Sequence, residues 1–338
     1  MKPVSLDLVV CTYDNAALLD RTLEAMSRLR VPADVRCRAL VVDNNCTDDT
    51  PAVVGRWTAL FPVPLSIIRE TKQGLTPARL RGVLETDGEW IAFVDDDCLL
   101  AEDWVEEAAR FAADHPECGA FGGRVVPAWE TAPPPYVLEH RYAYAAKEHG
   151  DTPHRRKWLA GAGMVVRRAA LEACGWTGRQ FLEDRVGGRL VSGGDVEIGL
   201  RIAAGHEVWY VPACTLRHVI PARRMTRPYL RRITLGLGAS RHHAAALTWR
   251  GSYPAWLLYS LAGALGFLAM GVRRLVRPRA GLDVALAFSP LAGWWLAVWE
   301  MLRMDARERR ELLGRATPGR RAPINQAEEG PRAPSIAR

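Results

Sequence analysis

Short apolar runs alternate with amphipathic stretches over the first hundred residues of the chain. The runs are rich in β-branched and aromatic residues, each stops at polar residues, and they lie at residues 6–11, 38–43, 65–69 and 90–94. After the first run, apolar residues recur at helical spacing at Leu18, Leu19, Leu23 and Met26. Further helices are predicted from about Pro51 and over residues 77–84. Strands that alternate with helices predict an α/β fold with a mostly parallel central sheet flanked by helices.

The pattern is looser after about residue 115, where a proline-rich connection covers residues 127–135. Residues 158–168 predict a glycine-bearing loop that enters another strand, and Ser192-Gly193-Gly194-Asp195 precedes a further helix. Residues 206–212 predict the last strand, and we expect His218 to follow it in a loop.

Two apolar segments, residues 254–271 and 282–302, are each about long enough to span the hydrocarbon core of a membrane. The residues between them include Arg273, Arg274, Arg277 and Arg279. We expect an apolar helical pair that lies monotopically in one leaflet, with these arginines on its headgroups. Trp294, Trp295 and Trp299 then form an interfacial belt. A spanning hairpin, a buried hairpin and a surface for an oligomer are the alternatives.

The composition agrees with a folded chain, since 49% of the 338 residues are hydrophobic and 25% are charged. The formal net charge of +7 indicates a polyanionic partner, such as nucleic acid, anionic lipid or a phosphorylated substrate. The 7 cysteines are scattered and form no Cys-x-x-Cys pair, which argues against a disulfide framework or a zinc site. Asp7 interrupts the first apolar stretch, so we expect no secretory signal and a location in the cytosol.

Three adjacent carboxylates, Asp95, Asp96 and Asp97, follow directly after the apolar run at residues 90–94. Neighbouring acids repel one another and destabilise a fold unless a cation neutralises them. Ligands of open α/β sheets bind at the carboxyl ends of strands, and hard carboxylate oxygens suit a divalent cation that bridges phosphates. The triplet therefore predicts a metal–phosphate site, with a solvated acidic turn as the alternative.

Motifs in a fixed order carry a family resemblance. They are Thr12-Tyr13-Asp14-Asn15, Val42-Asp43-Asn44-Asn45-Cys46-Thr47-Asp48-Asp49, Glu70-Thr71-Lys72-Gln73-Gly74-Leu75-Thr76-Pro77-Ala78-Arg79 and Phe93-Val94-Asp95-Asp96-Asp97. Together they resemble the nucleotide-binding half of family 2 glycosyltransferases with the GT-A fold. Three later motifs resemble the acceptor side of that family: Gly161-Ala162-Gly163-Met164, Gly194-Asp195-Val196-Glu197-Ile198-Gly199-Leu200-Arg201 and Leu216-Arg217-His218. The resemblance covers roughly residues 5–235.

This resemblance implies an enzyme of cell-surface polysaccharide synthesis that takes a sugar from a nucleotide-diphosphate donor. Mn²⁺ or Mg²⁺ would bridge the donor phosphates and stabilise the charge that builds on the leaving group. By resemblance, Asp97 holds the metal with Asp95 and His218, and Asp95 and Asp96 also contact the nucleotide-sugar. The division of roles among the three acids stays open, and a structural role is the alternative for His218.

The other donor contacts that the resemblance implies are Thr12, Tyr13, Asp14, Asp43, Arg79, Gly163 and Arg224. Asp43 would accept a hydrogen bond from the base, and because uracil presents an N–H group, we expect a UDP-sugar. A turn-forming role is the alternative for Asp43, and an exposed helix charge is the alternative for Arg79. Arg224 belongs to a cluster with Arg223, Arg227, Arg231 and Arg232. That cluster would hold the diphosphate, contact a lipid-phosphate acceptor, lie on anionic headgroups or form a solvated helix face.

Asp195 occupies the position of the catalytic base in the family motif. A base that acts opposite the leaving group inverts the anomeric centre. Gly193 and Gly194 let the backbone pass close to a substrate, and Glu197 would orient the acceptor or fix the loop. The alternative for Asp195 is a helix N-cap, which would lower its pKa.

Two other functions fit parts of the pattern. A nucleotidyltransferase that acts on a sugar phosphate typically has a glycine-rich basic loop after its first strand, which residues 12–17 lack. In a basic nucleic-acid-binding protein the arginines would lie among exposed aromatics, whereas here they gather beside apolar segments, so we expect no nucleic-acid partner. The expected partners are a nucleotide-sugar donor, a glycan or lipid-linked acceptor and the cytoplasmic membrane surface, and a homo-oligomer is left open.

The expected organisation has three parts. A GT-A catalytic domain covers residues 1–240, an apolar membrane-associated helical region covers residues 241–313, and a disordered tail covers residues 314–338. The expected location is the cytoplasmic face of the cell membrane, because nucleotide-sugars are made in the cytoplasm.

Overall fold

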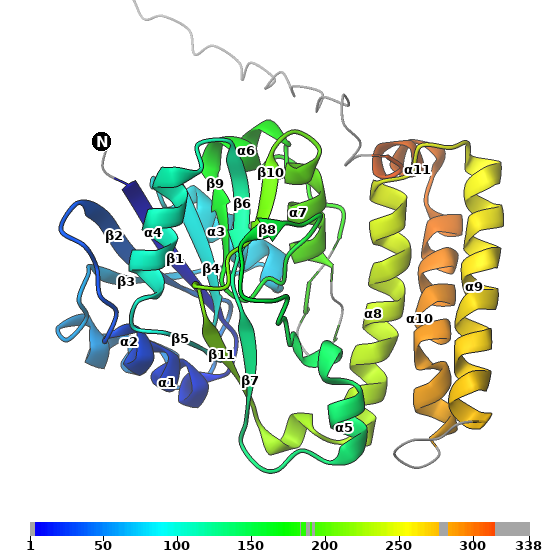
Figure 1. Cartoon of the computed structure of the whole chain (residues 1–338), viewed down its shortest axis with the longest axis horizontal. Helices are drawn as coiled ribbons and strands as arrows, with labels where there is room; N and C mark the ends of the chain where they lie inside the picture. Colours follow the sequence, from blue (N-terminus) through cyan, green and yellow to red (C-terminus); the bar gives the residue numbers. More distant parts are fainter. Residues whose placement is uncertain (1–3, 183, 187–189, 191–192, 277–282, 315–338) are drawn as a thin grey trace, which may run out of the picture.

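The computed structural model (Figure 1) describes residues 4–182, 184–186, 190, 193–276 and 283–314, so Arg277, Arg279 and most of the expected tail lie outside the described residues. Its strands are β1 (Val4–Thr12), β2 (Val35–Asp43), β3 (Leu65–Arg69), β4 (Trp90–Asp95), β5 (Cys98–Leu100), β6 (Cys118–Gly122), β7 (Val125–Trp129), β8 (His154–Arg155), β9 (Met164–Arg167), β10 (Glu207–Tyr210) and β11 (Leu216–Ile220). Its helices are α1 (Ala16–Met26), α2 (Thr50–Thr58), α3 (Leu75–Leu84), α4 (Trp104–Asp114), α5 (Pro135–Glu139), α6 (Arg168–Ala173), α7 (Gly194–Ala203), α8 (Arg227–Leu247), α9 (Tyr253–Val276), α10 (Val284–Arg303) and α11 (Ala306–Leu312). Two 3-10 helices are η1 (Arg141–Tyr144) and η2 (Ala222–Arg224).

A mixed sheet with the strand order β3-β2-β1-β4-β9-β6-β10-β8 forms the centre of the α/β part. Strands β3, β2, β1 and β4 are parallel neighbours, whereas β9 runs antiparallel to β4 and β6 on its two sides. The α/β class and the first four predicted strands are confirmed. Because parallel strands end at the same edge, the polar residues that follow β1, β2 and β4 are gathered there.

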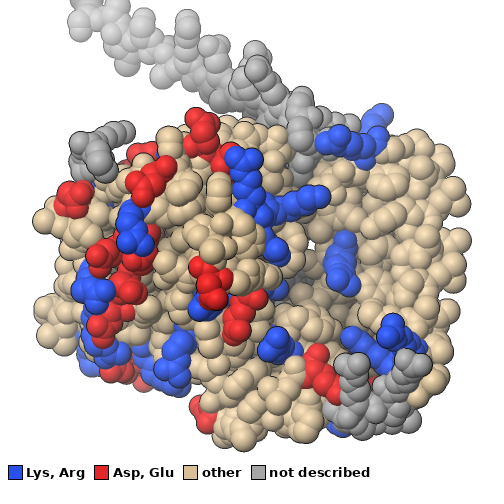
Figure 2. All heavy atoms as spheres, in the orientation of Figure 1, with Lys and Arg blue, Asp and Glu red and all other residues tan. Residues whose placement is uncertain are grey.

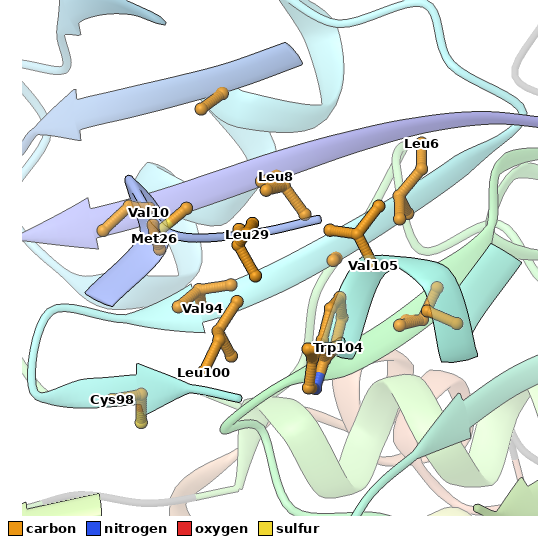
Figure 3. Packing of buried hydrophobic residues seen from close by; sticks show 14 of the residues in the cluster. Leu6, Leu8, Val10, Met26, Leu29, Val94, Cys98, Leu100, Trp104 and Val105 are labelled. Atoms are coloured by element: carbon orange, nitrogen blue, oxygen red, sulfur yellow. The ribbon is translucent and has the colours of Figure 1, made fainter. Parts of the chain in front are cut away.

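Strand β1 is buried on both faces, because each face of the sheet carries its own apolar layer. Leu8 belongs to one core cluster and the next residue, Val9, belongs to the other, so successive side chains enter opposite layers. In the first cluster, shown in Figure 3, side chains of β1 and β4 pack near Met26 of α1 and Trp104 of α4. This two-sided burial explains why β1 and β4 appear in the sequence as continuous apolar runs.

A smaller sheet with the order β5-β11-β7 adjoins the acid triplet. Strand β11 pairs antiparallel with β5 and parallel with β7, and it contains His218, so the prediction that His218 lies in a loop is wrong. The Cα partner of His218 on β5 is Cys98, the residue directly after Asp97. The strand was missed because it has five residues and two of them, Arg217 and His218, are basic.

Helices α8, α9 and α10 pack together beside the α/β part (Figure 1). At one end, Asp283 before α10 lies 3.1 Å from Arg227 and 2.9 Å from Arg231, both on α8. Toward the other end, His243 of α8 lies 3.5 Å from Glu300 of α10. Helices α8 and α10 therefore run in the same direction and remain in contact over most of their length.

The two predicted apolar segments form α9 and α10, which are long and apolar enough to cross a membrane by length and composition alone. Helix α8 continues through residue 240, so the predicted domain boundary falls inside a helix. Trp295 and Trp299 are exposed, but Trp294 is buried and its Nε1–H donates to the Ser260 carbonyl at 2.8 Å. The predicted place of Trp294 in an interfacial belt is therefore wrong.

The contact between α8 and α10 gives a stability prediction. A Cβ atom at Gly293 of α10 would lie 1.8 Å from the Leu235 carbonyl oxygen of α8, so Gly293→Ala should push the helices apart and cost about 1–3 kcal/mol. Gly266→Ala in α9 is the matched control, since its Cβ would meet no atom within 4 Å. In thermal unfolding of the full chain, we expect a lower midpoint for Gly293→Ala and no loss for Gly266→Ala. An unchanged midpoint for Gly293→Ala would contradict this packing.

Candidate active site

A cavity of about 1010 Å³ opens beside the carboxyl ends of β1 and β4. Its volume lies at the top of the range of about 300–1,000 Å³ that ligand pockets usually have. The loops after β1, β2 and β4 line one part, and the loop before β9 and the start of α7 line another. Helices α8, α9 and α10 line a third part, and residues of α3, η1, β11 and η2 also contribute. Figure 2 shows the surface hollowed between the α/β part and the C-terminal helices. Residues from both parts of the molecule thus enclose one cavity.

Asp97 is buried and is held by two cationic side chains. His218 Nε2 lies 3.3 Å from Asp97 Oδ1, and Arg224 Nη1 lies 2.5 Å from Asp97 Oδ2. The pairing of β11 with β5 sets the first contact, because it places His218 opposite Cys98. The other ring nitrogen of His218, Nδ1, lies 3.0 Å from the Tyr144 carbonyl oxygen, and this hydrogen bond fixes the ring orientation.

These charges shift the protonation of the cluster. Burial alone would raise the pKa of Asp97, but His218 and Arg224 outweigh burial and hold that pKa well below its ordinary value. Burial alone would lower the pKa of His218, but the Asp97 carboxylate raises it above its ordinary value.

Ligand atoms of Asp95, Asp97 and Cys98 lie within 4.8 Å of one another. The two carboxylates thus have the type and spacing that a divalent cation requires.

Asp96 is turned toward the end of β1. Its carboxylate oxygens accept hydrogen bonds from Thr12 Oγ1 at 2.7 Å and from Asn15 Nδ2 at 2.8 Å. Burial, together with the neighbouring charge of Asp97, raises the pKa of Asp96 to about 7. Asp96 therefore ties the end of β4 to the end of β1, and it also lines the cavity.

The loop after β1 places three predicted nucleotide contacts, Thr12, Tyr13 and Asp14, in the lining of the cavity. Asp14 adopts a positive φ of 45°, and its Oδ1 accepts the Thr47 N–H at 2.7 Å. This bond joins the loop after β1 to the loop after β2.

Asp43 is buried at the end of β2. Its Oδ1 accepts the Cys46 N–H at 2.7 Å, which is the turn-forming role named above as the alternative. Among the residues that the structure describes, the cavity lining includes the next residue, Asn44, but not Asp43. A contact between Asp43 and a base stays a prediction.

Arg79 is buried with an exposed fraction of 3%, so the alternative of an exposed helix charge is wrong. Its Nη1 lies 2.9 Å from Asp184, its Nη2 lies 3.5 Å from Asp95, and its guanidinium lies 5.5 Å from the centre of the Phe93 ring. Asp184 was not predicted as a site residue. Its second oxygen accepts the Gly193 N–H at 2.9 Å, so Arg79 and Asp184 connect the acid strand β4 to the start of α7.

Asp195 lies in the first turn of α7, whereas the N-cap position is Gly193. Its Oδ2 accepts the Gly161 N–H and its Oδ1 accepts the Val196 N–H, both at 2.8 Å. Burial and the charge of Asp184 raise the pKa of Asp195 to about 6, opposite to the lowering that an N-cap role would bring. A carboxyl group with a pKa near neutrality is suited to accept a proton from a substrate.

A comparison with known proteins decides the family. The sequence profile described as "Glycosyl transferase family 2" matches residues 7–175. The chain belongs to glycosyl transferase family 2. This family 2 member is 24% identical over 271 residues to the succinoglycan biosynthesis protein ExoM of Rhizobium meliloti, which covers 78% of this chain and 82% of ExoM. It is 27% identical over 142 residues to the glucosyl-dolichyl phosphate glucuronosyltransferase of Haloferax volcanii, over 41% of this chain and 44% of that protein.

A solved structure shares the fold of this glycosyltransferase. The mannosyltransferase PcManGT from Pyrobaculum calidifontis, described in complex with GDP-Man and Mn²⁺, matches with a TM-score of 0.54 and 21% identity. The match covers 92% of this chain and 84% of that chain. The predicted GT-A fold and family are thus confirmed, which favours a glycosyltransferase over a nucleotidyltransferase or a nucleic-acid-binding protein.

In this glycosyltransferase, the glycine of the Gly161-Ala162-Gly163-Met164 motif that lines the cavity is Gly161, whereas the predicted glycine was Gly163. Among the described residues, Gly161 lines the cavity and Gly163 does not. Gly163 has a φ of +68°, and a Cβ there would lie 2.5 Å from Leu216, whereas a Cβ at Gly161 would lie 2.5 Å from Arg79 Nη2. The motif that contains both glycines was the available signal, but spacing alone does not tell which one approaches Asp195.

Glu197 fixes the loop before α7, which is one of its two predicted roles. It is fully buried and pairs with Arg201 at 2.7 Å. Its carboxylate also accepts the backbone N–H groups of Phe181 at 2.9 Å and Leu182 at 2.7 Å. Glu197 is not part of the described cavity lining, so the geometry favours loop fixation over acceptor orientation.

Lys147, Trp158 and Arg185 also line the cavity and were not predicted. Lys147 Nζ lies 4.9 Å from the centre of the Trp158 ring. All three come from irregular loops, where no periodic pattern marks which side chains face a site.

Proposed function

We propose that this family 2 glycosyltransferase is metal-dependent and inverting, and that it moves a sugar from a UDP-sugar to a hydroxyl group of a glycan or lipid-linked acceptor. The observation that carries the proposal is a single cavity lined by the acids that follow β4 and by Asp195, a carboxyl group with a raised pKa. The name of ExoM supports a role in cell-surface polysaccharide synthesis. The name of the Haloferax relative, which refers to a glucosyl-dolichyl phosphate, supports a lipid-linked acceptor.

We assign Asp95, Asp97 and His218 to a bound Mn²⁺ or Mg²⁺, which would replace the proton between His218 Nε2 and Asp97, while Nδ1 keeps its hydrogen bond to the Tyr144 carbonyl. The fit rests on hard carboxylate oxygens within 4.8 Å of one another and on His218 Nε2, which lies 3.3 Å from Asp97. When bound, the cation supplies positive charge that stabilises the leaving diphosphate. PcManGT is described in complex with Mn²⁺, which supports the proposal that this chain also uses a divalent metal.

We assign the donor to the part of the cavity at the carboxyl ends of β1 and β4. The proposed contacts that line the cavity are Thr12, Tyr13, Asp14, Arg79, Asp95, Asp96 and Arg224. Asp43, which lies outside the described lining, is proposed to reach the base, and Gly163 is not retained as a contact. Asp43 uses Oδ1 for the Cys46 N–H, so a contact with the uracil N–H falls to Oδ2. PcManGT is described with GDP-Man, so guanine is the competing base that a binding test must include.

Asp195 acts as the general base in this proposal. As the acceptor hydroxyl oxygen attacks the anomeric carbon, its proton passes to the Asp195 carboxylate. The bond between that carbon and the diphosphate oxygen breaks, and the nucleoside diphosphate leaves with the electron pair. Attack from the face opposite the leaving group inverts the centre. With a pKa of about 6, Asp195 is anionic at neutral pH before each turnover and returns its proton to solvent afterwards.

We expect UDP to bind at least about tenfold more tightly with Mn²⁺ than with a chelator, because a pyrophosphate beside the acid triplet needs a bridging cation. Asp97→Asn should remove most of this gain, while Asp114→Asn, which removes an exposed carboxylate at the end of α4, should keep it. Calorimetric titration with UDP and GDP measures both the metal effect and the choice of base. Equal UDP affinity with and without metal would contradict the assigned site.

We expect kcat/KM to rise with pH through about 6 and to level off near neutrality, because Asp195 must be deprotonated to act as a base. Asp195→Asn should lose transfer by about a hundredfold or more and lose the dependence on this pKa, while it keeps UDP and metal binding. The test is a pH profile of transfer beside a UDP titration of the same preparation. An Asp195→Asn variant that transfers normally but unfolds at a lower temperature would instead assign Asp195 a structural role.

We also propose that the exposed apolar surface of α9 and α10 rests on the cytoplasmic face of the membrane. Helix α9 carries an exposed apolar stripe of Leu258, Leu261, Leu265, Leu268 and Val272, and Figure 2 shows almost no charge over this part of the surface. Helix α8 contacts α10 and also lines the cavity with the α/β part. If α9 and α10 spanned the membrane, α8 and the charged surface of the α/β part beside it would therefore lie at the depth of the hydrocarbon. An interfacial position of α9 and α10 avoids this.

Replacing two leucines of this stripe should release the chain from lipid. Leu258 and Leu265 are 70% and 58% exposed, so Leu258→Gln with Leu265→Gln should leave the fold intact and weaken vesicle binding at least about tenfold. Leu60→Gln is the control, since Leu60 is 68% exposed but lies on the α/β part. Flotation with vesicles of phosphatidylglycerol and phosphatidylethanolamine measures the effect. Equal flotation of both variants and the parent chain would contradict the proposed surface.

A further inference from the structure

The cavity has an end, here called the Asp195 end, where the start of α7 meets two irregular loops. Its lining residues are Lys147, Trp158, Ala160, Gly161, Asp195 and Val196. The backbone of Lys147 is held by β7, because it exchanges hydrogen bonds of 3.0 and 3.1 Å with Val125. Trp158 lies against α7, since a Cβ at Gly199 would be 3.2 Å from the Trp158 Cα. Both side chains therefore stand on a fixed backbone beside the proposed general base.

Trp158 offers an aromatic face inside this end of the cavity. It is 37% exposed, and Lys147 Nζ lies 4.9 Å from the centre of its ring. An indole ring is a broad apolar surface on which the C–H groups of a sugar ring can stack, while the hydroxyl groups at the sugar's edge stay free. The Asp195 end thus combines a platform for a sugar ring with a cation next to it.

Lys147 belongs to a group of basic side chains that lack an acidic partner. Lys147, His149 and Arg156 together line a small adjoining pocket, and Arg156 Nη2 lies 3.4 Å from His149 Nε2. Two acids of the surrounding segments, Asp151 and Glu207, already pair with other arginines. Among the described residues, no carboxylate forms an ion pair with Lys147 or Arg156. The group therefore has room for an anion from outside the chain.

The charges on this group act on one another. Burial lowers the pKa of Lys147, and the positive charge of Arg156 adds to the lowering, while the Asp195 charge opposes it. Burial also lowers the pKa of His149, and the charges of Arg156 and Lys147 lower it further. Of the described carboxylates, Asp195 is the one whose charge acts on Lys147. Lys147 therefore lies on the side of the general base, away from the proposed metal ligands.

We propose that the Asp195 end binds an acidic sugar of the acceptor, with the sugar ring on Trp158 and its anionic group at Lys147. This inference rests on the proposed function, because it names the chemical class of the acceptor for the reaction at Asp195. The lysine ammonium is a compact charge with three donors on a flexible stem, which suits a carboxylate or a phosphate group. A hydroxyl group on the ring that Trp158 holds then faces Asp195, which lines the same end of the cavity.

Titration of the full chain with small sugars, followed by ligand-observed NMR, tests the proposal. The probes are methyl glucuronide, glucose 6-phosphate and the neutral methyl glucoside. UDP and Mg²⁺ are present in excess, so that the acidic probes do not bind at the metal site. We expect at least one acidic sugar to bind at least about tenfold more tightly than methyl glucoside, and that sugar identifies the anionic group as carboxylate or phosphate.

Substitutions separate the two parts of the site. Lys147→Met keeps an unbranched side chain but removes the charge, so the acidic sugar should bind no better than the neutral one. Lys147→Arg, which keeps the charge, should retain the preference. Trp158→Ala should weaken acidic and neutral sugars alike, by at least about fivefold, and leave their ratio unchanged. Lys157→Met is the matched control, because Lys157 is exposed one residue before Trp158, and it should change each affinity less than twofold.

Three results would overturn the proposal. Equal losses in Lys147→Met and Lys157→Met would indicate diffuse attraction to positive charge. UDP-glucuronate that binds more tightly than UDP-glucose, with the difference lost in Lys147→Met, would assign the anionic group to the donor sugar. A Lys147→Met variant that binds every sugar as the parent chain does, but transfers with a shifted pH profile, would assign Lys147 a role through the charge of Asp195 alone.

A UDP titration of the same preparations separates this proposal from the proposed function. Metal-dependent UDP binding without a preference for acidic sugars overturns the acidic acceptor and leaves the donor site standing. A preference that depends on Lys147 and persists without UDP, in a chain that binds no UDP, supports the sugar site and counts against the donor site. Thermal unfolding of each variant identifies those that fold as the parent chain does, and only these are compared.

Discussion

Three consecutive acids at the end of a buried strand repel one another unless their charge is neutralised, and much of the structure serves this requirement. Asp96 accepts hydrogen bonds from Thr12 and Asn15, and its pKa is raised to about 7, whereas Asp95 and Asp97 lie against cationic side chains. Arg79 comes from α3, His218 from β11 and Arg224 from η2, and each lies against Asp95 or Asp97. Arg224 is 127 positions from Asp97 in the sequence. The charges are therefore balanced only when the small sheet and η2 have packed against the main sheet, so the site forms together with the tertiary fold.

The same requirement places the C-terminal helices. Arg224 ends η2, and Thr226, two residues later, is the N-cap of α8, where its hydroxyl accepts the Tyr229 N–H at 3.4 Å. The residue that neutralises Asp97 thus lies two positions before the N-cap of α8, and α10 packs along α8. The reaction centre and the apolar helices are one structural unit, which explains why a boundary drawn at residue 240 from composition falls inside a helix.

The sequence predicted the parts of the fold whose own residues determine their structure. Strands β1, β2 and β4 are buried on both faces over most of their length, so each contains a continuous apolar run that needs no partner to be identified. Strand β11 is different, because its pairing with β5 and β7 stabilises a short segment that contains two basic residues. Asp184 was missed for a related reason. Its role depends on Arg79, which is 105 positions away, and no local pattern marks that contact.

Asp195 shows how the surroundings of a residue can reverse an inference from its position. A helix N-terminus favours the charged form of a carboxyl group by about 0.3–1 kcal/mol at exposed sites, which would lower the pKa of Asp195. Burial and the charge of Asp184 outweigh this effect, while Arg79 and the N–H groups of Gly161 and Val196 limit the rise to a pKa of about 6. The balance leaves a carboxylate that is charged at neutral pH and still basic enough to take a proton. Helix α7 thus supplies the position of this group, and its burial beside Asp184 supplies the basicity that a general base requires.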